Sequence, residues 1–160
     1  RESIFNILAS RRPFDGLRVI DLFAGTGALG LEAMSRGAAH CLFVDMSAEA
    51  RGLIRLNIEA FSLLGSTRIF RRDATSLGMP GTIEPFDLAF VDPPYGKSLG
   101  EAAASSLLAG GWLRRDGMLV LEEHSDAAPA GLAGYDLLDR RGFGDTTVGF
   151  FATAAGAEQR

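Results

Sequence analysis

The 160-residue sequence has little of what disulfides, metal sites and membrane spans require. Its single cysteine, Cys41, excludes an internal disulfide and leaves no second thiolate for a zinc site, so we interpret it as a core residue. Its two histidines, His40 and His124, lack ligand spacing, and we expect no metal. No apolar run approaches the roughly 20 residues that span a bilayer, and no signal peptide is recognisable. We therefore expect a cytoplasmic protein without a membrane partner.

Lysine is almost absent, and the formal net charge is −4. Strong binding to nucleic acid usually depends on clustered lysine and arginine, so this balance alone argues against a nucleic-acid partner. The basic residues that are present are unevenly spread: they include four arginine pairs and a single lysine, Lys97. The pairs lie at residues 11–12, 71–72, 114–115 and 140–141. A pair of this kind is more often a solvated surface feature than a phosphate contact.

Short apolar runs alternate with helical stretches, a pattern typical of βαβ units and a parallel sheet. Strands are predicted at residues 18–23, 41–45, 67–72, 86–92 and 118–122. Helices are predicted at residues 28–36, from Ser47 as N-cap to near Gly65 with Ile54, Ile58 and Phe61 on one face, at residues 99–109, and around Ile4, Ile7 and Leu8. Residues 135–141 and 147–153 read as a final antiparallel pair. Because the first five strands are continuously apolar, we expect a single α/β domain over residues 1–160 with both sheet faces covered.

An aspartate lies at or next to the carboxyl end of each of the first four predicted strands: Asp21, Asp45, Asp73 and Asp92. In an open α/β sheet, ligands bind outside the carboxyl ends of the strands, where the strand order reverses. A single aspartate there is more often a turn former or a helix cap. Four in successive turns indicate a shared binding crevice.

The first of these turns contains a glycine loop, Gly25-Thr26-Gly27-Ala28-Leu29-Gly30, which matches G-x-G-x-x-G. Asp45 follows Gly25 by 20 residues, where an acid would hold ribose hydroxyls. The motif alone fits either a dinucleotide or another adenosine cofactor. The charge of the crevice favours S-adenosylmethionine, because acids repel a pyrophosphate but attract a sulfonium and an ammonium group.

The expected cofactor-binding residues surround this loop. Asp73 would bind the adenine amine, the glycines would let the backbone approach the methionine moiety, and Phe23 and Met46 would pack on adenosine or on the helix behind it. The full expected set is Asp21, Phe23, Gly25, Thr26, Gly27, Asp45, Met46, Asp73 and Ala74.

The stretch Asp92-Pro93-Pro94-Tyr95 suits methyl transfer to an exocyclic amine. The Asp92 carboxylate can accept one amine N–H and the Pro93 carbonyl the other, which frees the nitrogen lone pair. The two prolines fix the backbone and supply no competing donor. Tyr95 can stack on an unpaired base. We expect these four residues to be catalytic.

Three segments together resemble the RsmD family of bacterial methyltransferases: RESIFN at the start, DLFAGTGALGLEAMSRGA from Asp21, and VDPPYG from Val91. The resemblance covers essentially the whole chain. It implies a Rossmann-like class I methyltransferase with a seven-stranded, mostly parallel sheet. It also implies methylation of the 2-amino group of a guanine in 16S rRNA. Because an acidic core should bind naked RNA weakly, we expect the substrate to be a partly assembled small subunit, and we expect the enzyme to be a monomer. Members of that family carry a basic segment ahead of the RES motif, so we expect one upstream of Arg1.

Three alternatives remain open from the sequence. The motif at Asp92 is shared with adenine-amine methyltransferases on DNA or other RNA. The glycine loop also fits an oxidoreductase domain that binds NAD. A non-catalytic RNA-binding module could retain the same fold.

Overall fold

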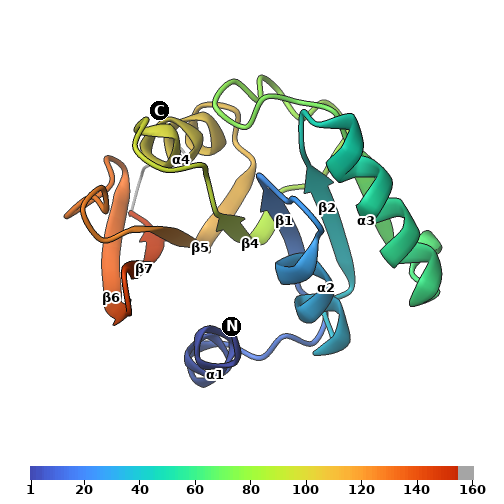
Figure 1. The fold of residues 1–160 in the computed structure, drawn as a ribbon, viewed down its shortest axis with the longest axis horizontal. Helices are drawn as coiled ribbons and strands as arrows, with labels where there is room; N and C mark the ends of the chain where they lie inside the picture. The colour runs from blue at the N-terminus through green and yellow to red at the C-terminus, as the bar shows by residue number, and fades with distance from the viewer. Residues whose placement is uncertain (155–160) are drawn as a thin grey trace.

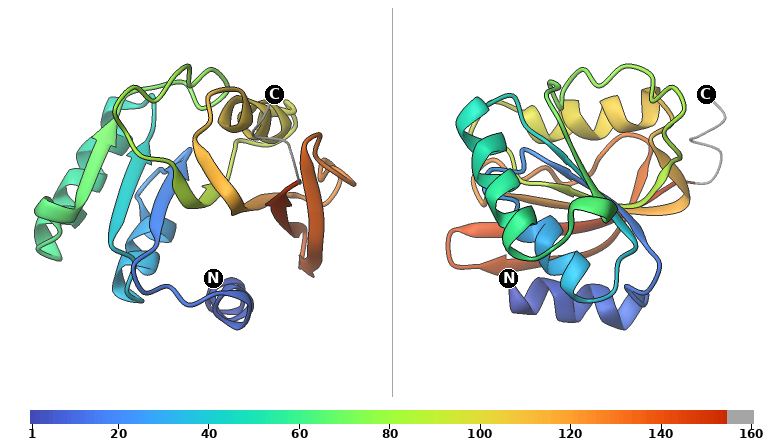
Figure 2. Two further views of the ribbon diagram at one scale, coloured as in Figure 1. Left: turned by 180° about the vertical axis from the view of Figure 1, so that it is seen from behind. Right: turned by 90° about the vertical axis from the view of Figure 1, so that its right-hand side faces the viewer.

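The computed structural model describes residues 1–154, which form one seven-stranded sheet with helices on both faces (Figures 1 and 2). The strand order is β3-β2-β1-β4-β5-β7-β6. The first five strands are parallel, and β7 pairs antiparallel with both β5 and β6. The strands are β1 (Arg18–Leu22), β2 (His40–Val44), β3 (Thr67–Phe70), β4 (Phe86–Val91), β5 (Leu113–His124), β6 (Tyr135–Phe143) and β7 (Thr146–Thr153). The helices are α1 (Glu2–Arg11), α2 (Ala28–Ser35), α3 (Ala48–Ala60), the 3-10 turn η1 (Leu64–Ser66) and α4 (Leu99–Ala109).

Each face of the sheet has its own apolar cluster. The helices α1, α2 and α3 cover one face, where Phe5, Ala33 and Ile54 pack with strand residues such as Phe43 and Phe90. The helix α4 and two loops cover the other face, as the views in Figures 1 and 2 show. Successive side chains of a strand point to opposite faces, so a continuously apolar strand contributes to both clusters. This confirms the prediction that both faces of the central strands are covered. Cys41 is also buried, as expected.

Three details of the sequence prediction are wrong. The helix α3 ends at Ala60 instead of near Gly65, and Phe61 is 65% exposed instead of sharing the buried face of Ile54 and Ile58. The strand β3 lies at the edge of the sheet and is at most half-buried. The strand β5 begins at Leu113, five residues before the predicted start. Its first half carries charged residues that hide the apolar pattern.

No helix among residues 1–154 is both long enough and apolar enough to cross a membrane.

An acidic residue links the amino ends of the central strands, at the opposite end of the sheet from the four aspartates. Asp87, buried at the start of β4, accepts a hydrogen bond from the Arg18 N–H at 2.9 Å. It also pairs with Arg12 at 3.2 Å and with Arg114 at 3.7 Å. Two of the arginine pairs therefore contribute a member to a structural clamp, because a buried carboxylate requires paired charge and hydrogen bonds.

Gly30 allows α2 to pack closely against β2. A methyl group at this position would lie 2.5 Å from the Phe43 ring and 2.7 Å from the Cys41 Sγ. Both neighbours are fully buried, so neither can move aside easily. The third glycine of the motif therefore serves helix–sheet packing.

We predict that Gly30→Ala destabilises the fold by about 1–3 kcal/mol, the usual cost of overpacking a core. The matched control is Gly52→Ala in α3, where an added methyl meets nothing within 4 Å. That control should stabilise the protein by about 0.5–1 kcal/mol through helix propensity. Urea unfolding measures both; equal stabilities for the two variants would contradict this account of Gly30.

Candidate functional site

The four aspartates lie at the carboxyl ends of the parallel strands, around the point where the strand order reverses between β1 and β4. Asp21 is the fourth residue of β1, and Asp45 and Asp92 directly follow β2 and β4. Asp73 lies three residues beyond the end of β3. Asp21 is close enough to feel the charges of both Asp45 and Asp92. The structure therefore brings these three acids together at the carboxyl ends of β1, β2 and β4.

Asp21 lies beneath the glycine loop and not at its rim. Its side chain is 1% exposed, and its Oδ2 accepts a hydrogen bond from the Gly30 N–H at 3.0 Å. Burial raises the pKa of Asp21 to about 8; the Gly30 N–H opposes this shift, and the charges of Asp92 and Asp45 add to it. Since Gly30 is in the first turn of α2, Asp21 anchors the helix N-terminus, which is otherwise without a side-chain cap.

The glycine loop connects β1 to α2 through left-handed backbone. Gly25 and Gly27 have φ of 60° and 82°, a region that favours glycine. The Gly25 N–H donates to the Asp45 Oδ2 at 2.9 Å, which joins the loop to the end of β2. Thr26 is exposed at the tip, and its carbonyl accepts a hydrogen bond from the Asn57 Nδ2 at 3.0 Å.

Asp45 organises the turn that follows β2. Its Oδ1 accepts a hydrogen bond from the Ser47 N–H at 2.9 Å, and Ser47 caps α3 as predicted by accepting from the Ala50 N–H. The Arg51 Nη1 donates to the carbonyls of Asp45 and Met46 at 3.2 and 2.9 Å. Met46 is 53% exposed, so its side chain is available to a ligand and is not part of the core.

The remaining residues expected to bind the cofactor differ in exposure. Asp73 is exposed, and its Oδ1 accepts from both the N–H and the hydroxyl of Thr75. These two hydrogen bonds lower the pKa of Asp73, which keeps the carboxylate ionised. Ala74 is buried in the α4-side core, so only its backbone could reach a ligand. Phe23 is half-buried and has a φ of 54°, a strained conformation for a bulky residue next to the crevice.

The Asp92-Pro93-Pro94-Tyr95 segment leaves β4 at this same edge. Pro93 is buried, whereas Asp92, Pro94 and Tyr95 are exposed. The Tyr95 ring is 64% exposed and packs edge-on against the His124 ring, with 5.5 Å between centroids and 71° between planes. An aromatic ring held in this way presents an open face at the edge of the site.

Asp92 lies beside a second carboxylate, that of Glu122. The register pairs Val91 with Leu121, which places Asp92 and Glu122 at adjacent positions on β4 and β5. Although its side chain is exposed, partial desolvation raises the pKa of Asp92 to about 7, and the charge and hydrogen bond of Glu122 contribute further. Glu123, on the opposite face of β5, adds a smaller repulsion.

The carboxyl ends of the strands therefore carry a cluster of acidic residues without basic partners in the part of the chain that the structure describes. Among residues 1–154, no arginine, lysine or histidine forms an ion pair with Asp21, Asp45, Asp73 or Asp92. Uncompensated carboxylates that repel one another favour a cationic ligand.

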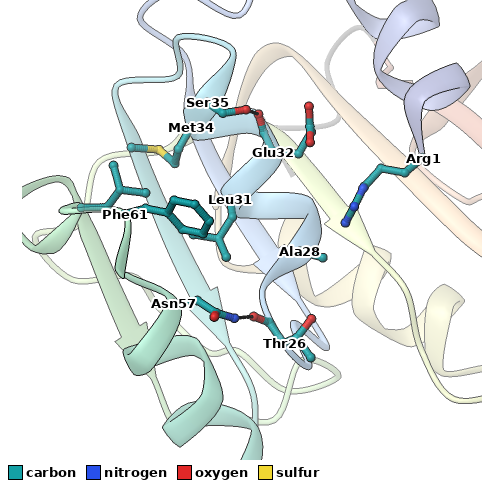
Figure 3. Close-up of a pocket in the computed structure, with 10 residues that line it drawn as sticks. Arg1, Thr26, Ala28, Leu31, Glu32, Met34, Ser35, Asn57 and Phe61 are labelled. Carbon is teal, nitrogen blue, oxygen red and sulfur yellow. Dashed lines mark hydrogen bonds between the residues drawn. The ribbon is translucent and has the colours of Figure 1, made fainter. Parts of the chain in front are cut away.

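A separate cavity of about 520 Å³ lies between α2 and α3 (Figure 3). Leu31, Met34 and Phe61 form its apolar wall, and Arg1 and Glu32 lie on its other side. Of the residues expected in the site, only Thr26 lines it. Since none of the four aspartates lines this cavity, it is distinct from the acidic cluster at the strand ends.

Sequence reasoning missed Glu122 and His124, which lie at the end of β5 beside Asp92 and the Tyr95 ring. The signal was present in the letters LEEHS, because the strand-end argument applies to the fifth strand as well as to the first four. It also missed Arg51, which holds the turn at Asp45, and Asn57, which holds the loop at Thr26.

The comparisons with known proteins agree on the family. The family model described as Conserved hypothetical protein 95 matches residues 1–152. YlbH of Bacillus subtilis (strain 168), named provisionally as an rRNA methyltransferase, is 38% identical over 124 residues, covering 76% of this chain and 66% of that protein. Ribosomal RNA small subunit methyltransferase D of Escherichia coli (strain K12) is 35% identical over 123 residues, covering 76% of this chain and 60% of that protein.

The solved structures agree on the fold. The structure of yhhF from Escherichia coli, named provisionally as a methyltransferase, superposes with a TM-score of 0.81 at 28% identity and covers 96% of this chain and 83% of that one. The match spans less than two thirds of the length of each of the two relatives above. The seven-stranded sheet with its antiparallel final pair is that of a Rossmann-like class I methyltransferase, as expected. The chain thus belongs to the RsmD family, the family described as Conserved hypothetical protein 95.

Proposed function

We propose that this chain is an S-adenosylmethionine-dependent methyltransferase that modifies the 2-amino group of a guanine in 16S rRNA of the small ribosomal subunit. The observation that carries the proposal is the position of Asp92 to Tyr95 at the end of β4, beside the glycine loop and the acids. The names of two relatives, each specifying rRNA methylation, support the RNA substrate.

The residues of the crevice fit S-adenosylmethionine, which carries two positive charges and no phosphate. Asp45 would bind the ribose hydroxyls with its remaining lone pairs, and the free Oδ2 of Asp73 would accept from the adenine amine. Gly25 and Gly27 let the backbone approach the methionine moiety, above the buried carboxyl group of Asp21. Met46 and Phe23 would flank the adenosine, and the backbones of Thr26 and Ala74 would complete the site.

When bound, the cofactor supplies a methyl group activated by its sulfonium. The chain holds the acceptor: the Asp92 carboxylate and the Pro93 carbonyl each accept one N–H of the guanine amine. This draws the nitrogen toward tetrahedral geometry and directs its lone pair at the methyl carbon. The exposed Tyr95 ring stacks on the base and holds it outside the RNA helix. After transfer, the amine is acidic and releases a proton, so no strong base is required.

We further propose that the substrate is a partly assembled small subunit and that the enzyme acts as a monomer in the cytoplasm. The supporting fact is electrostatic, because residues 1–160 carry a net charge of −4, so this part of the protein gains little affinity for naked RNA from phosphate contacts. Proteins in a particle add contacts that do not depend on phosphate.

The reaction is tested with methyl-labelled cofactor and either small-subunit particles from a strain without this enzyme or DNA. We expect label in the particles as N2-methylguanosine, and RNA mapping then gives the nucleotide. Label in methyladenine would contradict the guanine assignment, and calorimetric binding of NAD but not S-adenosylmethionine would contradict the methyltransferase proposal.

We predict that Asp92→Ala lowers kcat by about 100-fold or more, as loss of a hydrogen-bonding group that acts on the reacting centre typically does. Binding of S-adenosylhomocysteine should stay within about threefold, because Asp92 holds the amine and not the cofactor. Asp136→Ala, which removes an exposed carboxylate from the edge strand β6, is the control and should leave both values unchanged. Wild-type turnover in Asp92→Ala would refute the role given to the motif.

The pKa of Asp92, raised to about 7, predicts a pH-dependent reaction. Below pH 7 the carboxyl group binds a proton and can no longer accept from the amine through that oxygen. As the pH decreases below 7, kcat/KM should therefore fall with a slope that approaches tenfold per pH unit; above pH 8 it should be constant. Glu122→Gln removes a like charge, lowers the pKa of Asp92 and should move the inflection to lower pH. Glu59→Gln, on the exposed side of α3, should keep the wild-type profile. A flat profile from pH 5.5 to 8.5 would contradict the assignment.

A further inference from the structure

The carboxylate of Glu122 has no role in the methyl-transfer chemistry described above. It lies at the mouth of the site, next to Asp92 across the β4–β5 ladder, and its charge helps to raise the pKa of Asp92. Two ionised carboxylates held this close repel each other. A ligand that brings its own adjacent N–H donors would relieve this repulsion.

The alternation of β5 directs Glu122 toward the substrate side. Val120 packs in the cluster under α1, whereas Leu121 packs in the cluster under α4. Glu122 therefore shares the face of Phe90 and Asp92, since side chains two apart point the same way. His124, two residues further, contacts the Tyr95 ring on this side. Glu123 points to the other face, where it feels the charge of Glu101 in α4.

Ionised carboxylates offer acceptors only, and neither Asp92 nor Glu122 forms an ion pair within residues 1–154. The Watson–Crick edge of guanine presents two adjacent donors, the N2 amine and N1–H. The corresponding edge of adenine presents one amine beside N1, which is an acceptor. A lone pair on N1 would face a carboxylate, and both groups would be left without a partner.

We propose that Glu122 is the residue that selects guanine: it accepts the N1–H of the base while Asp92 accepts an N–H of the neighbouring amine. This inference rests on the proposed function, because it concerns the same base in the same site. Asp92, Pro93 and Tyr95 can bind any exocyclic amine. Glu122 distinguishes whether the neighbouring ring nitrogen, N1, carries a hydrogen. Discrimination by one such contact amounts to roughly 10- to 100-fold.

The test uses 2-aminopurine, which keeps the 2-amino group but carries an acceptor at N1. Small-subunit particles are reconstituted with 16S rRNA that has either guanine or 2-aminopurine at the mapped target nucleotide. The wild-type protein should prefer guanine in kcat/KM by roughly 10- to 100-fold. In Glu122→Gln the carboxamide can donate to N1 or accept from N1–H, so this preference should fall by about tenfold. A fall of this kind cannot arise from lost stability, which reduces both activities equally.

Two controls separate charge and folding from recognition. Glu123→Gln removes a neighbouring charge on the opposite face, and Glu84→Gln removes an exposed one near the start of β4; both should keep the wild-type ratio. Binding of S-adenosylhomocysteine reports that each variant is folded.

The possible outcomes separate the two proposals. If the wild-type protein does not methylate guanine particles, the proposed function fails. If it methylates them but accepts 2-aminopurine equally, or if Glu122→Gln keeps the full preference, the function stands and the role of Glu122 is refuted. A fall in the ratio with Glu123→Gln as large as with Glu122→Gln would refute it as well, because the effect would then come from charge alone.

Discussion

The pairing of β1 with β2 on one side and β4 on the other is the constraint on which the site depends. The register sets Asp21 opposite Phe43 and Phe90, so the strand ends that carry Asp45 and Asp92 stand beside it. Side chains held by such a ladder cannot separate to relieve their repulsion. The fold therefore enforces a concentration of negative charge that flexible loops would disperse.

This repulsion is balanced in part by protons. The pKa of Asp21 is raised to about 8 and that of Asp92 to about 7, in both cases mainly by desolvation. A carboxyl group kept protonated by its surroundings releases its proton when a cation or an N–H donor arrives. Ligands of both kinds are those of the proposed reaction: a sulfonium cofactor and a base with adjacent donors. The unfavourable charge of the free protein thus becomes part of the affinity for these ligands.

Much of the fold could be predicted because its signals are local. The glycine loop, the Ser47 cap and α4 follow from short stretches of sequence, and the acids were found by counting strand ends. The inward direction of Asp21 and the burial of Ala74 were not predictable in the same way. They depend on which face each side chain takes, and a shift of one residue reverses that choice.

The arginine pairs show a similar limit. Sequence reasoning treated them as solvated, yet Arg12 and Arg114 pair with the buried Asp87, and Arg72 packs on Trp112 while donating to the Leu77 carbonyl. A guanidinium looks the same in the sequence whether it faces water, a carboxylate or a ring. Only the tertiary arrangement distinguishes these environments.

The position of Glu122 depends on an irregularity at the start of β5. Between the pairs Phe86↔Leu113 and Leu88↔Met118, β4 advances two residues while β5 advances five. The extra length is accommodated by Asp116 at a φ of 66° and by Gly117, where a methyl group would lie 2.7 Å from the Arg114 carbonyl.

If the register of the Phe86↔Leu113 pair continued along the strands without this bulge, Leu119 would lie beside Asp92. The bulge sets Glu122 there instead. Bulges are known to re-aim side chains near active sites, and they are specified by backbone conformations that an apolar pattern does not reveal. The acceptor pair at the mouth of the site is therefore a product of β5 geometry several residues upstream, which places Glu122 instead of Leu119 beside Asp92.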